Sequence, residues 1–333
     1  MGAGSCAAWS GPDAGATPPL VARAPAKINL GLFVGETRAD GRHELATVMQ
    51  SISLADELAL ERAPAGAGGD QVICAGVDGE NLAARALERF RAATGWEGPP
   101  LRLRIDKRVP VGAGLGGGSG DAAAALRLAA AAAGVADEEL LLALARGLGA
   151  DVPAQVRPGR WLATGAGERL QALPDPARPF GVLVLPAAQQ LSTAKVYAQL
   201  DARRRRHRAA PEPAEQAERA PALADRARAL GEALGAGAGL PPAELLANEL
   251  QDAAIDLCPA IEETLARARS TGAQVAMVSG SGPTVVALFG GDGGVALAHD
   301  AARALEGEGP APHVAVPVGA ELARARCRSV GQN

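Results

Sequence analysis

A glycine-rich segment places the strongest constraint on how this chain of 333 residues can fold. It runs from Pro110 to Asp121 and reads Pro-Val-Gly-Ala-Gly-Leu-Gly-Gly-Gly-Ser-Gly-Asp. Before it, 101–106 alternates apolar and polar residues as a half-buried strand does, and an alanine- and leucine-rich run after it predicts a long helix from about Gly120. Backbone N–H groups and the positive end of a helix dipole can together bind phosphate oxygens. A flexible linker would not normally run straight into a helix, so we favour a phosphate-binding loop.

Two common nucleotide-binding motifs do not fit this loop. Gly112, Gly114 and Gly117 match the pattern Gly-x-Gly-x-x-Gly. A dinucleotide-binding fold also needs an acidic residue at the end of the next strand, whereas the acidic residues at 137–139 begin another helix. A Walker A loop is excluded because no Gly-Lys-Ser/Thr closes the run.

The remaining pattern predicts an α+β protein of two domains, at 20–175 and 176–325. In the first domain we expect strands at 26–34, 48–60 (one or two) and 101–106, and helices at 81–94, from about 120, and ending near 147. In the second we expect strands at 181–185 and 313–318, a hairpin at 275–289, and helices at 193–200, 244–269 and 295–305. Residues 1–19 read as a disordered leader. The segment at about 201–240 has little apolar periodicity and reads as a surface insertion that is helical in part or mobile.

Composition narrows the class of protein. A net charge of −4 gives no general basic field for nucleic acid. No stretch approaches the roughly 20 strongly apolar residues of a membrane span. The cysteines at 6, 74, 258 and 327 lack paired spacing, so we interpret them as free thiols in a reducing cytoplasm.

The loop in its extended form, Pro-x-Gly-x-Gly-Leu-Gly-Gly-Gly-Ser, resembles the second signature motif of the GHMP kinases. Residues 25–30 (Pro-Ala-Lys-Ile-Asn-Leu) resemble the first motif and 279–284 (Ser-Gly-Ser-Gly-Pro-Thr) the third, in the expected order. The resemblance implies an N-terminal domain like domain 2 of ribosomal protein S5 and a ferredoxin-like C-terminal domain. ATP and the substrate would meet in the cleft between them.

Further segments resemble the diphosphocytidyl-methylerythritol kinases in particular. They are Lys27-x-Asn29, the run 38–43 (Arg-Ala-Asp-Gly-Arg-His) and the run 148–153 (Leu-Gly-Ala-Asp-Val-Pro). The resemblance implies ATP-dependent phosphorylation of the 2-hydroxyl of a cytidine-diphosphate-linked methylerythritol. A homoserine or mevalonate type of GHMP kinase is the alternative enzyme.

The family pattern implies roles for the residues of these motifs. Asp151 would be the catalytic base, and Lys27 would support it and the transferred phosphoryl group. Asn29 and His43 would hold the substrate, His43 at the cytosine. From the residues alone, Asp151 could equally be a helix cap and Lys27 a solvated strand residue.

On the nucleotide side, the resemblance assigns Asn81 and Lys107 to the adenine pocket. Asn81 could also start a helix and Lys107 could be a surface charge. The hydroxyl of Ser119 is a candidate ligand for phosphate or Mg²⁺. The cofactor-binding loop comprises Pro110, Gly112, Gly114, Leu115, Gly116, Gly117, Gly118, Ser119 and Gly120.

On the substrate side, the resemblance assigns a contact to Thr193 and stacking on cytosine to Tyr197. Gly280 and Ser281 would form a second tight loop near the phosphates, although a plain hairpin turn is the alternative. Where the family usually has a second aromatic residue, this chain has Arg42. A guanidinium can stack on a base, so we expect a mixed sandwich of Arg42 and Tyr197.

Parts of the sequence are also compatible with two other classes of function. The basic run 203–208 could bind RNA, but it adjoins acidic residues at 212, 215 and 218. An inactive binding module is disfavoured because Lys27, Asp151 and the glycine loop are all present. We therefore expect ATP and Mg²⁺ as cofactors, a small-molecule substrate, no nucleic acid or membrane partner, and a cytoplasmic monomer or homodimer.

Overall fold

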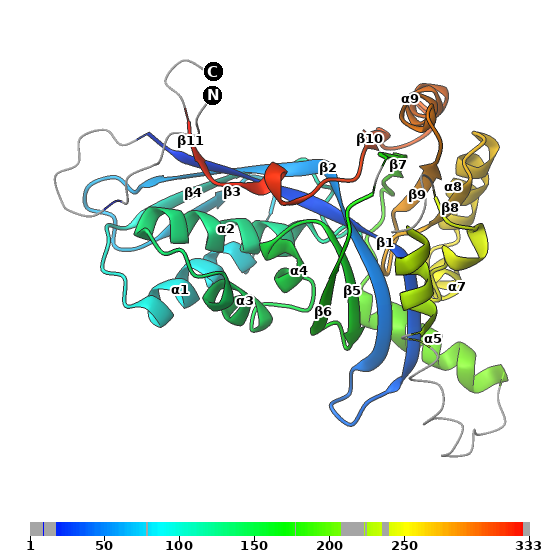
Figure 1. Cartoon of the computed structure of the whole chain (residues 1–333), viewed down its shortest axis with the longest axis horizontal. Helices are drawn as coiled ribbons and strands as arrows, with labels where there is room; N and C mark the ends of the chain where they lie inside the picture. Colours follow the sequence, from blue (N-terminus) through cyan, green and yellow to red (C-terminus); the bar gives the residue numbers. More distant parts are fainter. Residues whose placement is uncertain are drawn as a thin grey trace.

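The computed structural model describes residues 9, 18–77, 79–176, 178–207, 223, 225–234 and 240–328. They form two sheets with their helices (Figure 1). The larger sheet has the strand order β11-β1-β2-β4-β3, and β5 pairs with both β2 and β6. Its strands are β1 (Leu20–Thr37), β2 (His43–Arg62), β3 (Gln71–Cys74), β4 (Leu101–Asp106), β5 (Arg160–Gly165), β6 (Arg169–Leu173) and β11 (Arg326–Cys327).

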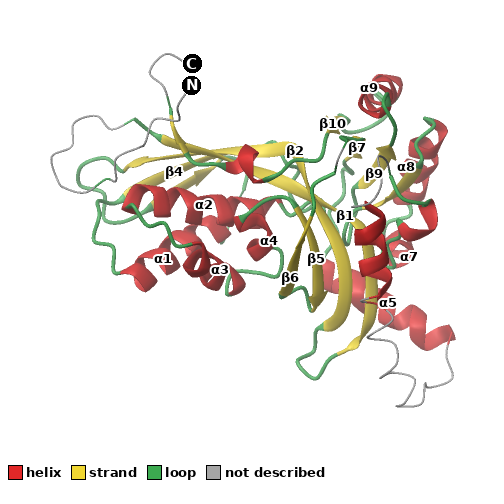
Figure 2. Ribbon diagram, viewed as in Figure 1, coloured by secondary structure: helices red, strands yellow, loops and turns green. Residues whose placement is uncertain are grey.

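Helices cover one face of this sheet (Figure 2). They are α1 (Leu82–Thr94), α2 (Gly117–Ala133), α3 (Glu138–Arg146) and α4 (Val152–Val156). The run of alanines 122–125 in α2 is fully buried and lets the helix lie close to its neighbours. Phe90 of α1, also fully buried, fills the space beside it. Truncating a phenylalanine in such a core costs about 3–5 kcal/mol.

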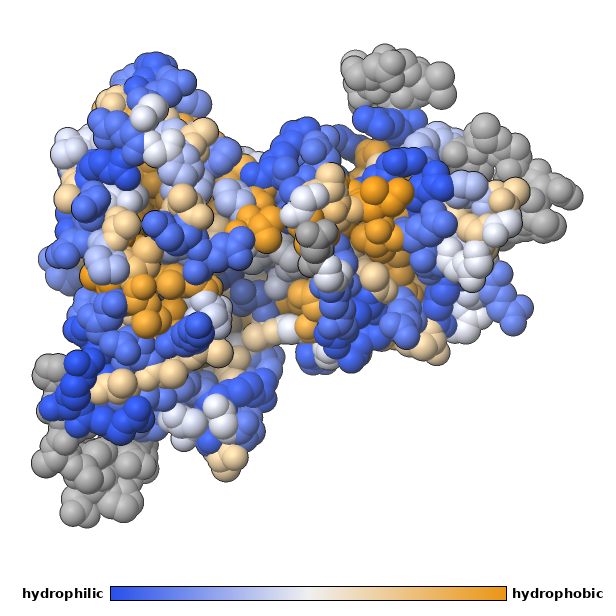
Figure 3. Space-filling model, turned by 180° about the vertical axis from the view of Figure 1, so that it is seen from behind, coloured by the Kyte–Doolittle hydropathy of each residue, from blue (hydrophilic) through white to orange (hydrophobic). Residues whose placement is uncertain are grey.

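The smaller sheet lies in the C-terminal part and has the strand order β10-β7-β9-β8. Its strands are β7 (Gly181–Leu185), β8 (Val275–Val278), β9 (Val285–Phe289) and β10 (His313–Ala315). The helices here are α5 (Thr193–His207), α7 (Gln251–Leu257), α8 (Ala260–Ser270) and α9 (Gly294–Ala304), with short 3₁₀ turns η1 (Ala243–Leu245) and η2 (Ala320–Ala323). Seen from behind, the two parts form lobes separated by a narrowing (Figure 3). The sequence prediction of a two-domain α+β fold is confirmed.

The long antiparallel pair β1–β2 extends from the helix layer to the C-terminal part (Figure 1). Ile28 and Leu30 face the hydrophobic core, as the alternation predicts. Lys27 and Asn29 point to the other side but are only 7% and 4% exposed. Since a charged side chain is buried only with partners, this polar stripe marks the place where the site is built.

The chain returns to the larger sheet at its C-terminal end. β10 ends at Ala315, earlier than predicted, and β11 pairs antiparallel with the start of β1. Arg127 of α2 joins these parts because its guanidinium donates to the carbonyls of Arg23, Gln155 and Ala323. Burial lowers the pKa of Arg127 to about 10.

Two elements begin earlier than predicted, although the stretch 48–60 is a single strand, one of the two predicted possibilities. α2 begins at Gly117 rather than near Gly120, with Gly116 as N-cap at φ 70°. Glycine has low helix propensity, so the first turn carries no sequence signal, and close packing decides it instead. The stretch 48–60 belongs to one continuous strand, β2, which begins at His43.

The region predicted as a surface insertion is helical in part, as expected, but one of its helices is buried rather than on the surface. α5 continues to His207, and a helix over 225–234 buries Ala227, Leu230 and Leu234 in the core between the two sheets. Their helical spacing is present in the sequence, but the surrounding alanine and arginine residues obscure it. Residues 208–222 lie outside the described residues, and with them the acidic positions 212, 215 and 218.

The structure also corrects the predictions of a disordered leader at 1–19 and of four free cysteines. Trp9 is 3% exposed and its backbone N–H donates to the carbonyl of Ala132, at 2.8 Å, so part of the leader packs on α2. Cys74 and Cys258 are free, as expected, whereas Cys327 is disulfide-bonded. The fourth cysteine, at position 6, and the rest of the leader up to 17 lie outside the described residues. Among the helices that the structure describes, none has the length and apolar character to cross a membrane.

Candidate active site

The glycine loop is held between the two domains by backbone contacts. The N–H of Lys27 in β1 donates to the carbonyl of Leu115 at 2.9 Å. Gly114 has φ 75°, and a Cβ placed there would lie 2.5 Å from the carbonyl oxygen of Ser279. Only glycine therefore allows the third motif, between β8 and β9, to pack on the loop.

Two cavities meet at this loop. The larger, of about 730 Å³, lies between the domains, and the smaller, of about 330 Å³, lies beside the start of α2. Gly114, Gly116 and Ser119 line both. A group bound in one cavity can therefore reach a group bound in the other across the loop.

The smaller cavity gathers most residues predicted to bind the cofactor. They are Asn81, Lys107, Pro110, Gly112, Gly114, Leu115, Gly116, Gly117, Gly118 and Ser119. Gly120 is the exception, because it is buried behind the loop, where a Cβ would lie 3.1 Å from the carbonyl oxygen of Pro25. Asn81 does start a helix, since its side chain accepts the N–H of Ala83 as the N-cap of α1, but it also lines the cavity.

Lys107 is not a surface charge. Its Nζ lies 2.5 Å from Oδ2 of Asp56 and 2.8 Å from Oδ2 of Asp121. Asp56 also accepts the N–H groups of Arg108 and Val109, while Oδ1 of Asp121 is buried without a hydrogen-bond partner among the described residues. Burial raises the pKa of Asp121 to about 7, against the opposing effect of Lys107. Sequence reasoning assigned a role to neither carboxylate, because Asp56 belongs to no motif, and in the glycine-rich segment that ends at Asp121 the prediction rests on backbone N–H groups.

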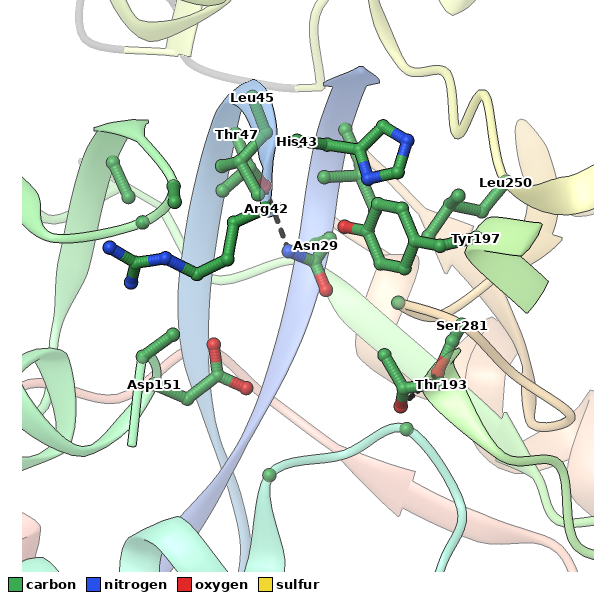
Figure 4. Close-up of a pocket in the computed structure, with 18 of the residues that line it drawn as sticks. Asn29, Arg42, His43, Leu45, Thr47, Asp151, Thr193, Tyr197, Leu250 and Ser281 are labelled. Carbon is green, nitrogen blue, oxygen red and sulfur yellow. Dashed lines mark hydrogen bonds between the residues drawn. The ribbon is translucent and has the colours of Figure 1, made fainter. Parts of the chain in front are cut away.

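The larger cavity contains the predicted catalytic pair. Nζ of Lys27 lies 3.5 Å from Oδ2 of Asp151 and donates to Oδ1 of Asn29 at 2.9 Å. Asp151 is the N-cap of α4, but its side chain makes no capping hydrogen bond, and 38% of it is exposed. The carboxylate therefore faces the cavity as a free acceptor (Figure 4). Lys27 is buried, so it is not the solvated strand residue that the sequence alone also allowed.

Asn29 is fixed by a residue that sequence reasoning did not single out. Its Nδ2 donates to Oγ1 of Thr47 at 2.8 Å, and this hydroxyl donates to the carbonyl of Gly31 at 2.6 Å. Thr47 is on β2 next to Asn29 on β1 (Figure 4). The chain of bonds leaves the amide of Asn29 in one orientation, with Oδ1 toward Lys27.

An aromatic wall closes the other side of the cavity. The rings of His43 and Tyr197 have centroids 4.9 Å apart. Nε2 of His43 lies 2.9 Å from Oδ1 of Asp201 on α5. Burial, and secondarily the charge of Asp151, raises the pKa of Tyr197 to about 12, so the phenol stays neutral.

Arg42 lines the same cavity but does not contact Tyr197. Its guanidinium pairs with Asp40 at 2.9 Å and its side chain is 58% exposed. Figure 4 places it on the side of Asn29 away from Tyr197, and the ring packed on Tyr197 is His43. The mixed sandwich of Arg42 and Tyr197 stays a prediction.

The third motif and α5 meet at the lower rim. Oγ1 of Thr193 and Oγ of Ser281 are 2.9 Å apart and both line the cavity (Figure 4). Gly280 packs against the glycine loop, since a Cβ there would lie 3.1 Å from the carbonyl oxygen of Gly114 and 3.4 Å from Nζ of Lys27. The turn between β8 and β9 is therefore part of the site as well as a hairpin connection.

Two arginines of the basic run at the end of α5 make contacts inside the protein. Arg203 pairs with Asp252 and Asp256 of α7. Arg204 donates to the carbonyls of Val34 and Gly35 at the end of β1. These contacts tie α5 to both domains and weaken the RNA-binding alternative.

Known proteins resemble this chain in sequence and in fold. The family models described as GHMP kinases N terminal domain and GHMP kinases C terminal match residues 81–159 and 220–306. A 4-diphosphocytidyl-2-C-methyl-D-erythritol kinase of Leifsonia xyli is 40% identical over 276 residues, which are 80% of this chain and 86% of the relative. One of Streptomyces coelicolor is 39% identical over 277 residues, covering 81% and 87%.

Solved structures agree. A crystal structure of 4-(cytidine 5'-diphospho)-2C-methyl-D-erythritol kinase superposes with a TM-score of 0.69 at 35% identity, covering 90% of this chain and all of that one. A homoserine kinase of Cytophaga hutchinsonii superposes with a TM-score of 0.68 over 95% of this chain and 99% of that one, but at 16% identity it supports the fold alone. The chain therefore belongs to the 4-diphosphocytidyl-2-C-methyl-D-erythritol kinase family of the GHMP kinases.

Proposed function

We propose that this protein transfers the γ-phosphoryl group of ATP to the 2-hydroxyl of 4-diphosphocytidyl-2-C-methyl-D-erythritol, a step in making isoprenoid precursors. The observation that supports this most is that two cavities share the glycine loop, with Lys27 and Asp151 lining the larger one. The smaller cavity suits a nucleotide, and the larger one an alcohol with a sizeable attached group. Relatives at about 40% identity bear the name of this kinase.

Asp151 accepts the proton of the attacking hydroxyl. Its carboxylate is free of capping bonds and lies 3.5 Å from the ammonium of Lys27. Lys27 neutralises negative charge that develops on the transferred group, and the N–H groups at the start of α2 bind its oxygens. Phosphoryl transfer depends on such positioning and electrostatics more than on covalent catalysis.

Mg²⁺ fits this arrangement through a single protein ligand. Among the described residues no group of three or more His, Cys, Asp or Glu could hold a metal ion by itself. Magnesium in kinases is bound largely by substrate phosphates and water with few protein ligands, and the hydroxyl of Ser119 beside the loop would be one of these ligands. The ion would supply charge neutralisation at the phosphates.

The larger cavity binds the cytidine end of the substrate on its aromatic wall. Tyr197 provides the stacking surface, His43 a hydrogen bond to the base, and Asn29, Thr193, Gly280 and Ser281 contacts nearer the reacting end. We expect the enzyme to act in the cytoplasm on this small molecule.

The test is ATP consumption by the purified protein with Mg²⁺ and the cytidine substrate, run beside homoserine and mevalonate. We expect turnover with the cytidine substrate only. Turnover of homoserine or mevalonate instead would keep the kinase chemistry and overturn the substrate. Absence of turnover with all three would overturn the proposal.

A further inference from the structure

The imidazole of His43 is held at one edge by an acceptor on the other domain. Nε2 lies 2.9 Å from Oδ1 of Asp201 on α5 and 3.3 Å from Oγ1 of Thr37, and only 9% of the His43 side chain is exposed. An ionised carboxylate can only accept hydrogen bonds, so Nε2 must carry the hydrogen of this bond.

The other ring nitrogen then has a defined character. A neutral imidazole carries one N–H, and a hydrogen on Nε2 leaves Nδ1 as an acceptor. Within the part of the chain that the structure describes, no hydrogen bond reaches Nδ1. Tyr197 packs at a centroid distance of 4.9 Å and further restricts the ring, which lines the larger cavity.

We infer that Asp201 is a positioning residue that fixes the tautomer of His43 and so makes the larger cavity select a base with an exocyclic amine. The inference rests on the proposed function. Cytosine presents an amino group, which donates to Nδ1. Uracil presents a carbonyl oxygen at the same position, which would face the Nδ1 lone pair with no hydrogen between them.

A purely structural role for Asp201, as a tie between α5 and β2, is the alternative. α5 has other ties, because Arg204 donates to the carbonyls of Val34 and Gly35 and Arg203 pairs with Asp252 and Asp256. Removing the carboxylate of Asp201 should therefore leave the helix in place. The two roles differ in their effect on base discrimination.

The experiment compares kcat/KM for the cytidine substrate and for its uridine analogue. We expect the wild type to favour cytidine by at least about 30-fold, since an unmatched polar pair in a desolvated pocket is strongly rejected. The side-chain amide in the Asp201→Asn variant can donate as well as accept a hydrogen bond, and so it permits both tautomers of His43. We expect its preference to fall to about threefold or less, with the KM for ATP unchanged.

Two further variants sharpen the comparison. Asp201→Glu retains a carboxylate and should keep part of the preference, and Asp252→Asn, an exposed control on α7, should keep all of it. An unchanged preference in Asp201→Asn overturns the inference. If neither Asp201 variant folds, inhibition of the wild type by CDP is compared with inhibition by UDP. Equal inhibition by the two nucleotides would overturn the inference. The two proposals fail in different ways. Turnover of the cytidine substrate with an unchanged base preference in Asp201→Asn contradicts only the inference, whereas absence of turnover in the wild type contradicts the proposed function.

Discussion

The two cavities that meet at the glycine loop are built in different ways. Apart from the loop, the smaller one is lined by the end of β3, the start of α1 and the segment that follows β4, all in the N-terminal domain between Cys74 and Asp121. The larger one takes residues from β1, β2, the start of α4, α5 and the turn between β8 and β9. One is thus a local structure, and the other forms only when both domains are assembled.

This difference separates chemical roles. Backbone N–H groups suit phosphates, which every nucleotide carries, and they require glycine rather than particular side chains. Side chains from both domains can discriminate among alcohols. Changes in the local cavity should therefore affect ATP, changes in the other should affect the second substrate, and changes at the shared residues should affect both.

The largest expected effect is at the reacting centre. Asp151→Asn should lower kcat by about 10³-fold, because an amide cannot accept the proton of the hydroxyl. Both KM values should change little, since the size of the side chain is retained. Steady-state kinetics with each substrate varied in turn would measure this. The exposed control Asp106→Asn should match the wild type, and a kcat within tenfold of the wild type in Asp151→Asn would exclude Asp151 as the base.

A substitution at the shared loop should come next. Gly114→Ala places a Cβ 2.5 Å from the backbone oxygen of Ser279, which cannot move aside easily. We expect kcat/KM to fall about 100-fold for both substrates, because a small displacement of positioned groups has a large effect on rate. Gly112→Ala is the matched control, since its φ of 69° is similar but its Cβ would meet only the side chain of Gln190. Equal losses in the two variants would show that backbone strain, and not the domain contact, is responsible.

The same contrast explains what could be predicted from the sequence. The glycine loop is one contiguous segment, and the positive φ angles at Gly112, Gly114 and Gly116 require glycine. The smaller cavity could therefore be predicted directly from the sequence. The start of α2 at Gly117 could not be predicted, because tertiary packing overrides low helix propensity there.

Residues of the larger cavity gave weaker signals. Lys27 and Asp151 could be assigned only through the family resemblance, since either residue alone has an ordinary structural explanation. Thr47 and Asp201 were missed because their roles depend on contacts with Asn29 and His43, which lie far away in the sequence. Hydrogen bonds between distant segments leave no local pattern from which to infer them.

An effect confined to the larger cavity should follow from Tyr197→Ala. Loss of the stacking surface should raise the KM for the cytidine substrate about tenfold, with the KM for ATP within twofold of the wild type. Tyr197→Phe keeps the ring and should behave almost as the wild type, because the neutral hydroxyl has no hydrogen bond to a described residue. A parallel rise in the KM for ATP would contradict the division between the cavities.

A different kind of effect concerns stability and belongs to the smaller cavity. The folded protein raises the pKa of Asp121 to about 7 by burial, whereas an unfolded chain has an ordinary value near 4. Between these values only the folded state holds the proton, so this contribution to stability is complete below about pH 4 and is lost as pH rises through about 7. The loss should amount to no more than about 2.5 kcal/mol between pH 5 and pH 8.

Asp121→Asn removes the titrating group and should remove this part of the pH dependence. Urea unfolding of the wild type and the variant at pH 5 and pH 8 would measure it as a change in the difference between their unfolding free energies. A constant difference would mean that Asp121 is ionised throughout, with Lys107 balancing two carboxylates. The smaller cavity would then present a net negative charge to ATP, and its affinity for phosphate would depend on the loop and α2 alone.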